Sequence, residues 1–386
     1  MSKYAAVVVG YNRTECIKRL LDSLLKADYQ GEEFDLIVSL DHADSLETKD
    51  YADSVKWPFG HKEVIYRPER MGLKAHILSC GDFLKDYEAI AVLEDDLIVS
   101  PGFYSYMKQT VDMYKDEPRV AGISLYSFKR NINAAAFFEP DYSEYDVYMM
   151  QKAQSWGQIW IRDKWQEFLK WYDDGKADAV LPSLDMPQYI KNWNNSWLKY
   201  HTAYCVAAGK YFVYPYMSLT TCCAVKGEHT GSTSNIYQVP LFRGKAAALR
   251  LPSFEKATVK YDIYYEREDL SQILGIPENK KLCVDLYNTK TLFEGYDFII
   301  TCRNIKGLVP LKSFGLELHP HEGNIIDNVP GKGIFLYKLP EDKSTLVFIN
   351  DSWEDIEYHL GMPIDFGMGM LKKYIKKIYL KKIKKK

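Results

Sequence analysis

AIAVLEDDLIVSPGF occupies residues 89–103. An apolar, strand-like run ends there in three adjacent carboxylates, Glu94, Asp95 and Asp96. Three neighbouring charges at the end of a buried strand repel one another and lose water, which costs free energy unless a cation offsets it. Mg²⁺ and Mn²⁺ prefer such oxygen ligands and keep positions for waters and phosphates. The stretch therefore favours a divalent-metal site for a diphosphate. The alternative is an exposed acidic turn before a helix that begins at Ser100-Pro101.

The composition is that of a globular protein. With 386 residues and 47% hydrophobic residues, the chain can hold two or three domains, or one large α/β domain with an appendage. The seven cysteines form no CxxC pair, which indicates reduced core thiols in a cytosolic protein. The apolar stretch Ala5–Val9 is too short for a signal peptide, and no stretch reaches the length of a membrane span. We therefore expect a cytoplasmic protein.

The first half of the chain alternates short β-branched runs with helical periodicity, the pattern of βαβ units. Gly10-Tyr11-Asn12-Arg13 follows the first run where a dinucleotide-binding protein would have GxGxxG, and no GxxxxGK[ST] loop occurs. A dinucleotide-binding Rossmann enzyme is therefore disfavoured. The expected strands are Ala5–Val9, Asp35–Leu40, Glu63–Tyr66, Ala89–Leu93 and Val120–Leu125. A helix with Leu73, Ile77, Cys80 and Leu84 on one face is expected between the third and fourth of these.

Beyond about residue 240 the pattern changes to short alternating stretches between charged turns. Examples are Lys281–Tyr287, Asp297–Arg303 and Gly333–Leu339, and Leu346–Asn350 follows the same style. This pattern indicates a smaller β-rich unit. The predicted organisation is therefore a first domain at residues 1–238, a β-rich accessory domain at 239–366 and a basic tail at 367–386.

Seven motifs in order carry a family resemblance: VVVGYNR, IVSLD, RMGLKAHI, LEDDLIVSPGF, SWGQIW at 155–160, NSW at 195–197, and PYMSLTTC followed by GEHTGS within 215–232. With them, residues 4–235 resemble nucleotide-sugar glycosyltransferases of the GT-A fold. The chain looks most like bacterial family 2-like sugar transferases, and also like N-acetylglucosaminyltransferases with a Glu-Asp-Asp metal motif. The resemblance implies an α/β fold: a Rossmann-like mixed sheet with helices on both faces, beside the smaller β-rich C-terminal unit.

The resemblance assigns metal and nucleotide contacts to matching residues. Asp96 would bind Mn²⁺ or Mg²⁺ directly, with His229 as a second ligand, while Asp95 would face the ribose or a metal-bound water, and Glu94 the donor sugar. Asp41 would accept the N–H of a uracil ring, although a turn or N-cap aspartate is the alternative. The remaining nucleotide-sugar contacts would come from Tyr11, Arg13, Arg70, Lys74 and Trp156. Of the neighbouring tryptophans, Trp160 and Trp165 are expected to be core anchors.

The general base is where this chain departs from the pattern. An inverting enzyme needs a carboxylate near the acceptor hydroxyl. Relatives often have an acid just before the NSW tryptophan, but here Asn194-Asn195 occupy that place. Asp185 is the best substitute by position, although it could equally cap the next helix. If Asp185 is not the base, Glu144, Asp146 or the second domain must supply it.

The leading hypothesis is therefore an inverting, metal-dependent glycosyltransferase that uses a UDP-sugar. Its acceptor would be a glycan or a lipid-linked glycan in surface polysaccharide assembly. A sugar nucleotidyltransferase is the second hypothesis, but the chain lacks the Gly-rich phosphate loop near its N-terminus. A non-catalytic carbohydrate-binding relative is the third, suggested by Asn194-Asn195. A haloacid-dehalogenase phosphatase is disfavoured because its nucleophilic aspartate belongs at the first strand.

The last 16 residues, LKKYIKKIYLKKIKKK, contain nine lysines and no acid. Since the whole chain has a formal net charge of −2, the remainder carries −11, and the tail is a separate basic segment. As a helix it would gather apolar residues on one side and lysines on the other, which is typical of a helix at a membrane surface. We expect it to hold the protein at the anionic inner face of the cell membrane. The alternative is a disordered basic tail, and nucleic acid is not expected as a partner because the acidic body would be repelled.

Overall fold

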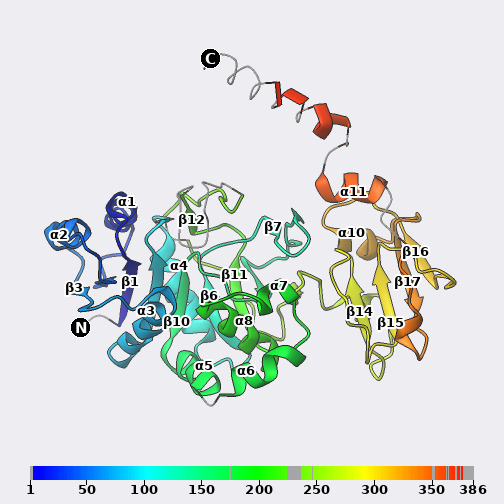
Figure 1. Cartoon of the computed structure of the whole chain (residues 1–386), viewed down its shortest axis with the longest axis horizontal. Coiled ribbons are helices and arrows are strands. Elements are labelled where there is room, and N and C mark those ends of the chain that lie inside the picture. Colours follow the sequence, from blue (N-terminus) through cyan, green and yellow to red (C-terminus); the bar gives the residue numbers. More distant parts are fainter. Residues whose placement is uncertain are drawn as a thin grey trace. The chain divides into compact units, whose positions relative to one another are not determined.

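The computed structural model of the chain describes residues 3–173, 175–223, 236–245, 247–349, 353–361, 363, 365–369, 372–373 and 375–376. The chain forms two compact units (Figure 1). Unit 1 comprises Met1–Lys129 and Pro140–Glu268, and unit 2 comprises Arg130–Glu139 and Asp269–Lys386. Each unit has its own sheet and its own hydrophobic core.

The large sheet of unit 1 has the strand order β13-β9-β11-β6-β10-β4-β1-β2-β3. Strands β1 to β4 are parallel, whereas β10 and β9 run antiparallel to their neighbours β4 and β11. The mixed sheet is the one that the GT-A resemblance implied. The strands are β1 (Tyr4–Gly10), β2 (Asp35–Leu40), β3 (Lys62–Tyr66), β4 (Ala89–Glu94), β6 (Val120–Ser124), β9 (Val147–Met150), β10 (Gln158–Ile161), β11 (Tyr211–Pro215) and β13 (Lys260–Tyr261). A separate antiparallel pair joins β5 (Leu97–Val99) to β12 (Thr220–Cys222).

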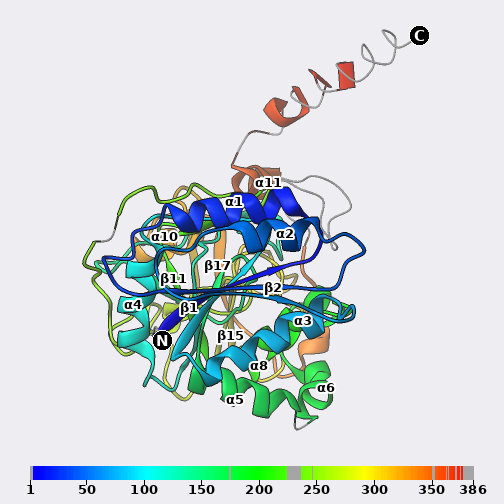
Figure 2. The ribbon, with the colours of Figure 1, turned by 90° about the vertical axis from the view of Figure 1, so that its left-hand side faces the viewer.

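Helices cover both faces of this sheet, as predicted. Figure 2 shows α1 and α2 on one side of β1 and β2, and α3, α5 and α8 on the other. Every residue of β1 is buried, which is expected of a parallel strand covered on both faces. The helices are α1 (Thr14–Leu25), α2 (Glu47–Ser54), α3 (Leu73–Ser79), α4 (Phe103–Tyr114), α5 (Arg162–Asp173), α6 (Lys176–Val180), α7 (Gln188–Lys191) and α8 (Trp197–Ala207), with 3₁₀ turns η1 (Cys80–Lys85) and η2 (Leu181–Ser183).

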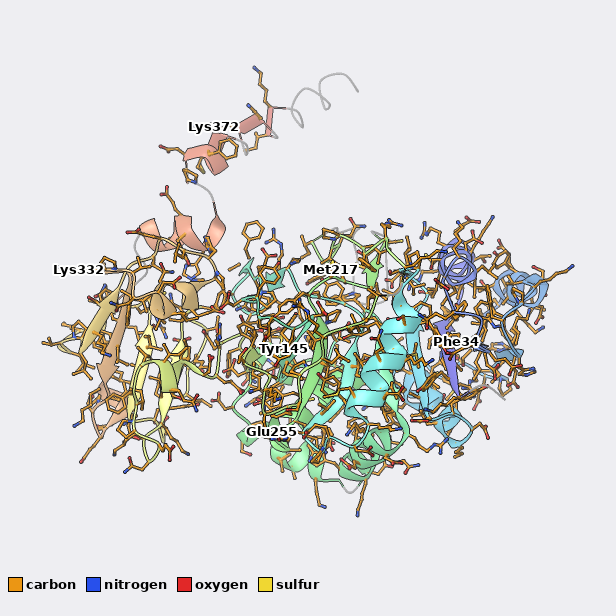
Figure 3. All side chains as sticks on the ribbon, turned by 180° about the vertical axis from the view of Figure 1, so that it is seen from behind. Phe34, Tyr145, Met217, Glu255, Lys332 and Lys372 are labelled. Carbon is orange, nitrogen blue, oxygen red and sulfur yellow. The ribbon has the colours of Figure 1, made fainter. Side chains whose placement is uncertain are left out.

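The core beneath α1 and α4 is rich in aromatic rings. Phe34, labelled in Figure 3, is fully buried and stacks on Tyr29 with ring centroids 5.0 Å apart. The rings of Phe103 and Tyr104 meet Phe34 edge-on at 5.8 and 5.2 Å. Edge-to-face and offset packing of this kind adds to the burial of apolar area.

The five strands predicted in the first half are present, with ends within one residue of the predicted ones. The predicted helix after Gly72 is shorter than expected, because α3 ends at Ser79 and continues as the 3₁₀ turn η1. Of the predicted apolar face, Ile77, Cys80 and Leu84 are buried and Leu73 is partly buried. A close contact accompanies the change in winding: a Cβ at Gly81 would lie 1.9 Å from Nε1 of Trp165, so only glycine fits there.

The boundary between the units differs from the prediction of 238. Residues 240–268 belong to unit 1 because their backbone is bonded to its sheet and helices. Strand β13 pairs with β9, the N–H of Asp146 donates to the carbonyl of Arg250 at 3.0 Å, and the Tyr114 hydroxyl donates to the carbonyl of Pro252 at 2.8 Å. These contacts span more than 100 residues of sequence, so the local change in pattern near residue 240 did not mark the boundary.

Unit 2 is a small β-rich unit, as predicted. Its sheet has the order β14-β15-β17-β16, and three of the predicted stretches form β14, β15 and β17. Leu346–Asn350 contributes an isolated bridge between Ile305 and Phe348 instead of a ladder. The elements are β14 (Leu282–Asp285), β15 (Phe298–Thr301), β16 (Lys312–Phe314), β17 (Ile334–Lys338), the pair β7 (Arg130–Asn131) and β8 (Ala136–Phe137), α9 (Leu270–Ile273), α10 (His321–Ile326), η3 (Lys343–Thr345) and α11 (Trp353–Leu360).

All seven cysteines are free thiols and all but Cys223 are buried, as predicted for core residues. In the ranges that the structure covers, no helix is both long and apolar enough to cross a bilayer. The predicted helix of the basic tail lies mostly outside the described residues. Within it, Lys372, labelled in Figure 3, is exposed, as are Lys373, Ile375 and Lys376.

Replacing Phe34 with alanine should lower the free energy of unfolding of unit 1 by about 3–5 kcal/mol, since the cavity left among packed rings cannot close fully. Urea unfolding followed by circular dichroism measures the change. Met217→Ala is the matched control, because that side chain is 62% exposed and its loss should change stability by less than about 0.5 kcal/mol. Equal losses in the two variants would contradict this account of the core.

Candidate active site

A pocket of about 550 Å³ lies at the carboxyl ends of β1, β2 and β4. These strands are parallel neighbours, so their last residues, Gly10, Leu40 and Glu94, meet at one edge of the sheet. In open α/β sheets, crevices at this edge are the usual ligand sites. The pocket is also lined by residues from four further segments: Asp41; Arg70, Gly72, Leu73 and His76; Ser155-Trp156; and Tyr237.

The three carboxylates form the acidic end of this pocket. Glu94 is the last residue of β4, and Asp95 follows it with a side chain only 4% exposed, whereas that of Asp96 is 25% exposed. Arg13 forms a bidentate pair with Asp95: Nε donates to Oδ2 at 3.1 Å and Nη2 donates to Oδ1. A third guanidinium nitrogen, Nη1, lies 3.8 Å from Oδ2 of Asp96. An exposed acidic turn, the alternative interpretation of the motif, is therefore excluded.

Burial raises the pKa of each of the three acids. For Glu94 burial acts together with the charges of Asp96 and Asp95, and the pKa reaches about 8. Burial raises the pKa of Asp95 to about 6, although the Arg13 guanidinium opposes the shift. The pKa of Asp96 is also raised by burial, against the same opposing charge. Without a bound cation, burial therefore favours the protonated, uncharged form of Glu94.

Asp41 holds the far wall of the pocket in place. Its Oδ1 accepts the backbone N–H groups of His42 at 2.9 Å and Met71 at 2.8 Å, and its Oδ2 accepts that of Gly72 at 2.9 Å. Gly72 has a φ of +75°, which favours glycine, and it precedes α3. The buried carboxylate thus fixes the loop that carries Arg70, which is more than the turn or N-cap role given as the alternative to base recognition.

Tyr11 and Arg70 meet at the rim. The Arg70 guanidinium lies over the Tyr11 ring, with its carbon 4.8 Å from the centroid, and both residues line the pocket. This cation–π pair presents an aromatic face and a positive charge side by side. The predicted nucleotide contacts Tyr11, Arg13, Asp41, Arg70 and Asp95 are therefore brought together.

His76 also lines the pocket and was missed by sequence reasoning. Its Nε2 lies 2.8 Å from Oγ of Ser39, within hydrogen-bond distance. Burial lowers the pKa of His76 to about 4, against the charge of Asp41. The signal in the sequence was its position, one helical turn after Gly72, on the same face of α3 as Leu73.

An aromatic wall closes the opposite side. The Trp156 ring lies between Tyr126 and Tyr237, with centroid distances of 4.8 and 4.9 Å. The next residue, Gly157, has a φ of +95°, and a Cβ there would lie 2.9 Å from Cγ2 of Thr220. Trp156 is thus held by a turn that only glycine can make. Trp160 and Trp165 are core anchors as predicted, stacked 3.6 Å apart and buried.

Two predicted residues do not line the pocket. The Lys74 ammonium points instead to the rings of Tyr172 and Tyr200, at 5.5 and 4.5 Å from their centroids. Asp185 accepts the Tyr264 hydroxyl on Oδ1 at 2.8 Å. Neither of the alternative bases lines it either: Asp146 accepts the N–H of Arg250, and Glu144 is exposed. His229 lies outside the described residues.

The residues present fit a cation that takes few protein ligands. Within the described part of the chain, no three or more His, Cys, Asp or Glu side chains converge on one metal position. The oxygens of Asp95 are already engaged by Arg13, which leaves Asp96 and Glu94 as the carboxyl groups that could hold an ion. Mg²⁺ and Mn²⁺ are bound through one or two carboxylates plus phosphates and waters in many sites, so this donor set is compatible with them.

No protein-family model matches the chain, and no curated protein matches its sequence. Solved structures similar to it include a mannosyltransferase, PcManGT from Pyrobaculum calidifontis, in complex with GDP-Man and Mn²⁺ (14% identity, TM-score 0.33). Another is S. aureus TarS in complex with UDP-GlcNAc (15% identity, TM-score 0.37). The matches cover 56% and 60% of this chain, and 57% and 61% of those chains. Function is therefore inferred from the pocket residues alone.

The raised pKa of Glu94 predicts a pH-dependent penalty on stability. Between its ordinary value near 4.5 and about 8, the folded chain keeps a proton that the unfolded chain releases, so stability falls as the pH rises through this window. In a chelator, Glu94→Gln should therefore be more stable than the unchanged chain at pH 8.5, by about 1–3 kcal/mol, and nearly equal to it at pH 5. Melting temperatures across this range measure the difference.

The exposed Glu47 on α2 provides the control, because Glu47→Gln should change the melting temperature equally at both pH values. A Glu94→Gln effect that does not grow with pH would contradict the assignment.

Proposed function

We propose that the chain is a glycosyltransferase that takes its sugar from a nucleotide-sugar, with a UDP-sugar as the leading candidate for the donor. The observation that carries the proposal is the pocket itself. It joins a desolvated cluster of carboxylates to the Tyr11–Arg70 pair at one side and the Trp156 wall at the other. A volume of about 550 Å³ is of the size that holds a small ligand with several polar anchors.

On the donor side, the flat face of Tyr11 would take the base, and Arg70 would offset the charge of the diphosphate. Asp41 keeps the loop that carries Arg70 in position through Met71 and Gly72. Asp96 would hold Mn²⁺ or Mg²⁺, with phosphate oxygens of the donor and waters as the other ligands. When bound, such an ion neutralises the charge that grows on the leaving diphosphate.

On the acceptor side, Trp156 would pack against a sugar ring, since apolar sugar faces fit aromatic rings. Of the four acids that line the pocket, Asp41 and Asp95 accept hydrogen bonds from the chain itself, and Asp96 is the proposed metal ligand. Glu94 is then the group left to exchange a proton in an inverting transfer, in place of Asp185. Its raised pKa brings it near the working pH, where proton transfer is most efficient.

A non-catalytic sugar-binding protein is the second candidate. It is favoured by the position of Asp185 against Tyr264, which leaves the pocket without the acid predicted by position in the sequence. The two candidates differ in turnover and not in donor binding. Release of UDP from a UDP-sugar in the presence of Mn²⁺ distinguishes them.

The test of donor binding is a thermal-shift screen with Mn²⁺ against UDP-, GDP-, dTDP- and CMP-sugars. A ligand at one hundred times its Kd stabilises the native state by about 2.7 kcal/mol, so the right nucleotide should reveal itself without knowledge of the acceptor. Asp96→Asn should abolish the Mn²⁺-dependent part of the shift while the protein without ligand melts as before or slightly higher, because a repelling charge is removed.

Asp163→Asn, an exposed aspartate on α5, should keep the full shift. If no nucleotide-sugar changes the melting temperature, or if Asp96→Asn keeps the whole Mn²⁺-dependent shift, the proposed site is wrong.

We also propose that the tail at 371–386 holds the protein at an anionic membrane surface, beside lipid-linked acceptors in the assembly of a surface polysaccharide. Each lysine near such a surface contributes about 1 kcal/mol before screening. Deleting these residues should abolish sedimentation with anionic liposomes and leave donor binding unchanged. Replacing the lysines by glutamine, which keeps the length, should have the same effect. Full liposome binding by the truncated chain would disprove the tail's role.

A further inference from the structure

We propose that Arg13 is a built-in counter-cation of the carboxylate cluster, which suppresses divalent-metal binding until a nucleoside diphosphate arrives. The inference rests on the proposed function, because it concerns the order in which the same site is filled. It assigns to Arg13 a positioning and regulatory role in place of the simple phosphate or base contact expected from the sequence.

The pairing is the first support. Nε and Nη2 of Arg13 occupy both oxygens of Asp95, and Nη1 lies 3.8 Å from Asp96. The side chains of Asp95 and Arg13 are 4% and 28% exposed, so water replaces little of this interaction. A two-pronged bond between a guanidinium and a desolvated carboxylate is among the stronger polar contacts in proteins.

The backbone fixes the guanidinium at this point. Arg13 immediately precedes α1, and its carbonyl accepts the N–H groups of Cys16 at 2.9 Å and Ile17 at 3.1 Å. Strand β1 ends three residues earlier and pairs in register with β4, so that Val9 lies beside Glu94. The start of α1 is therefore held next to the end of β4, and Arg13 reaches Asp95 without a long flexible stretch of chain.

A divalent cation that approaches Asp96 would meet this arrangement at close range. It would find both oxygens of Asp95 paired with Arg13 and a guanidinium nitrogen 3.8 Å from Oδ2 of Asp96. A guanidinium at this range repels a divalent cation, and partial desolvation strengthens the repulsion. A nucleoside diphosphate changes the balance, because its oxygens supply negative charge for both the metal and the guanidinium, and supply the ligands that the protein lacks.

Metal and nucleotide should then bind interdependently, and the coupling is necessarily reciprocal. Part of any such coupling comes from direct metal–phosphate bonds and does not involve Arg13. The part due to Arg13 appears in metal binding without nucleotide, where removal of the guanidinium should strengthen binding. A simple phosphate contact would leave metal binding without nucleotide unchanged.

The experiment titrates Mn²⁺ into the full chain without nucleotide and follows free Mn²⁺ by electron paramagnetic resonance. Arg13→Gln should bind Mn²⁺ at least about fivefold more tightly than the unchanged chain, the lower end of typical coupling factors. The enhancement of Mn²⁺ affinity by UDP, or by GDP if the donor screen selects it, should fall by the same factor. Arg13→Lys, which keeps the charge, should stay within about twofold of the unchanged chain.

Lys18→Gln is the matched control, because it removes one positive charge from an exposed position on α1, the helix that Arg13 precedes, outside the pocket lining. It should leave Mn²⁺ binding without nucleotide unchanged. Equal or weaker Mn²⁺ binding by a folded Arg13→Gln, or an equal gain in Lys18→Gln, would overturn the proposal.

If Arg13→Gln does not fold, the unchanged chain still decides. Mn²⁺ affinity that UDP and GDP leave unchanged within twofold, although either nucleotide binds, would overturn the coupling. If no nucleotide binds under any condition, the proposed function fails. The effect of Arg13 on Mn²⁺ binding is still tested by the titrations without nucleotide.

Discussion

The pairing of Arg13 with Asp95 is the interaction on which the pocket depends. A carboxylate as deeply buried as Asp95 loses most of its hydration, and leaving it without a partner would cost about 3–5 kcal/mol. The partner can reach it only because β1 and β4 are neighbours and α1 starts directly beyond β1. The order of strands in the sheet therefore determines the electrostatics of the site. With a different neighbour for β4, the three adjacent acids would have no counter-charge.

Much of this arrangement is predictable from local sequence. The strands of the first half were recognisable because a covered parallel strand needs a continuous apolar run, and residues 89–93 provide one. The acidic cluster was recognisable because adjacent carboxylates at the end of a buried strand cost free energy unless a cation offsets their charge. Asp41, Tyr11 and Arg70 follow or precede regular elements at one edge, so placing them together required only the parallel order of the strands.

The wrong predictions concern residues whose place depends on the direction of the side chain or on contacts with distant parts of the sequence. Lys74 and His76 are two positions apart on α3, and helical phase turns His76 into the pocket and Lys74 towards Tyr200. Nothing near Asp185 in the sequence signals Tyr264, which is 79 residues away. The unit boundary was misplaced for the same reason, because β13 is a strand of two residues whose partner, β9, lies more than 100 residues earlier.

The engagement of Asp41 also limits which base the pocket suits. A carboxylate offers about four acceptor positions, and three backbone N–H groups, from His42, Met71 and Gly72, already occupy Asp41. Two of these donate to Oδ1 and one to Oδ2, so a single acceptor position remains on Oδ2. Uracil and thymine present one ring N–H beside two carbonyl groups, which matches a single acceptor. Guanine presents a ring N–H and an amino group side by side, and one of these two donors would be left unpaired at a cost of about 1–3 kcal/mol. If Asp41 contacts the base as proposed, the same hydrogen bonds that hold the wall of the pocket would therefore favour uracil or thymine over guanine.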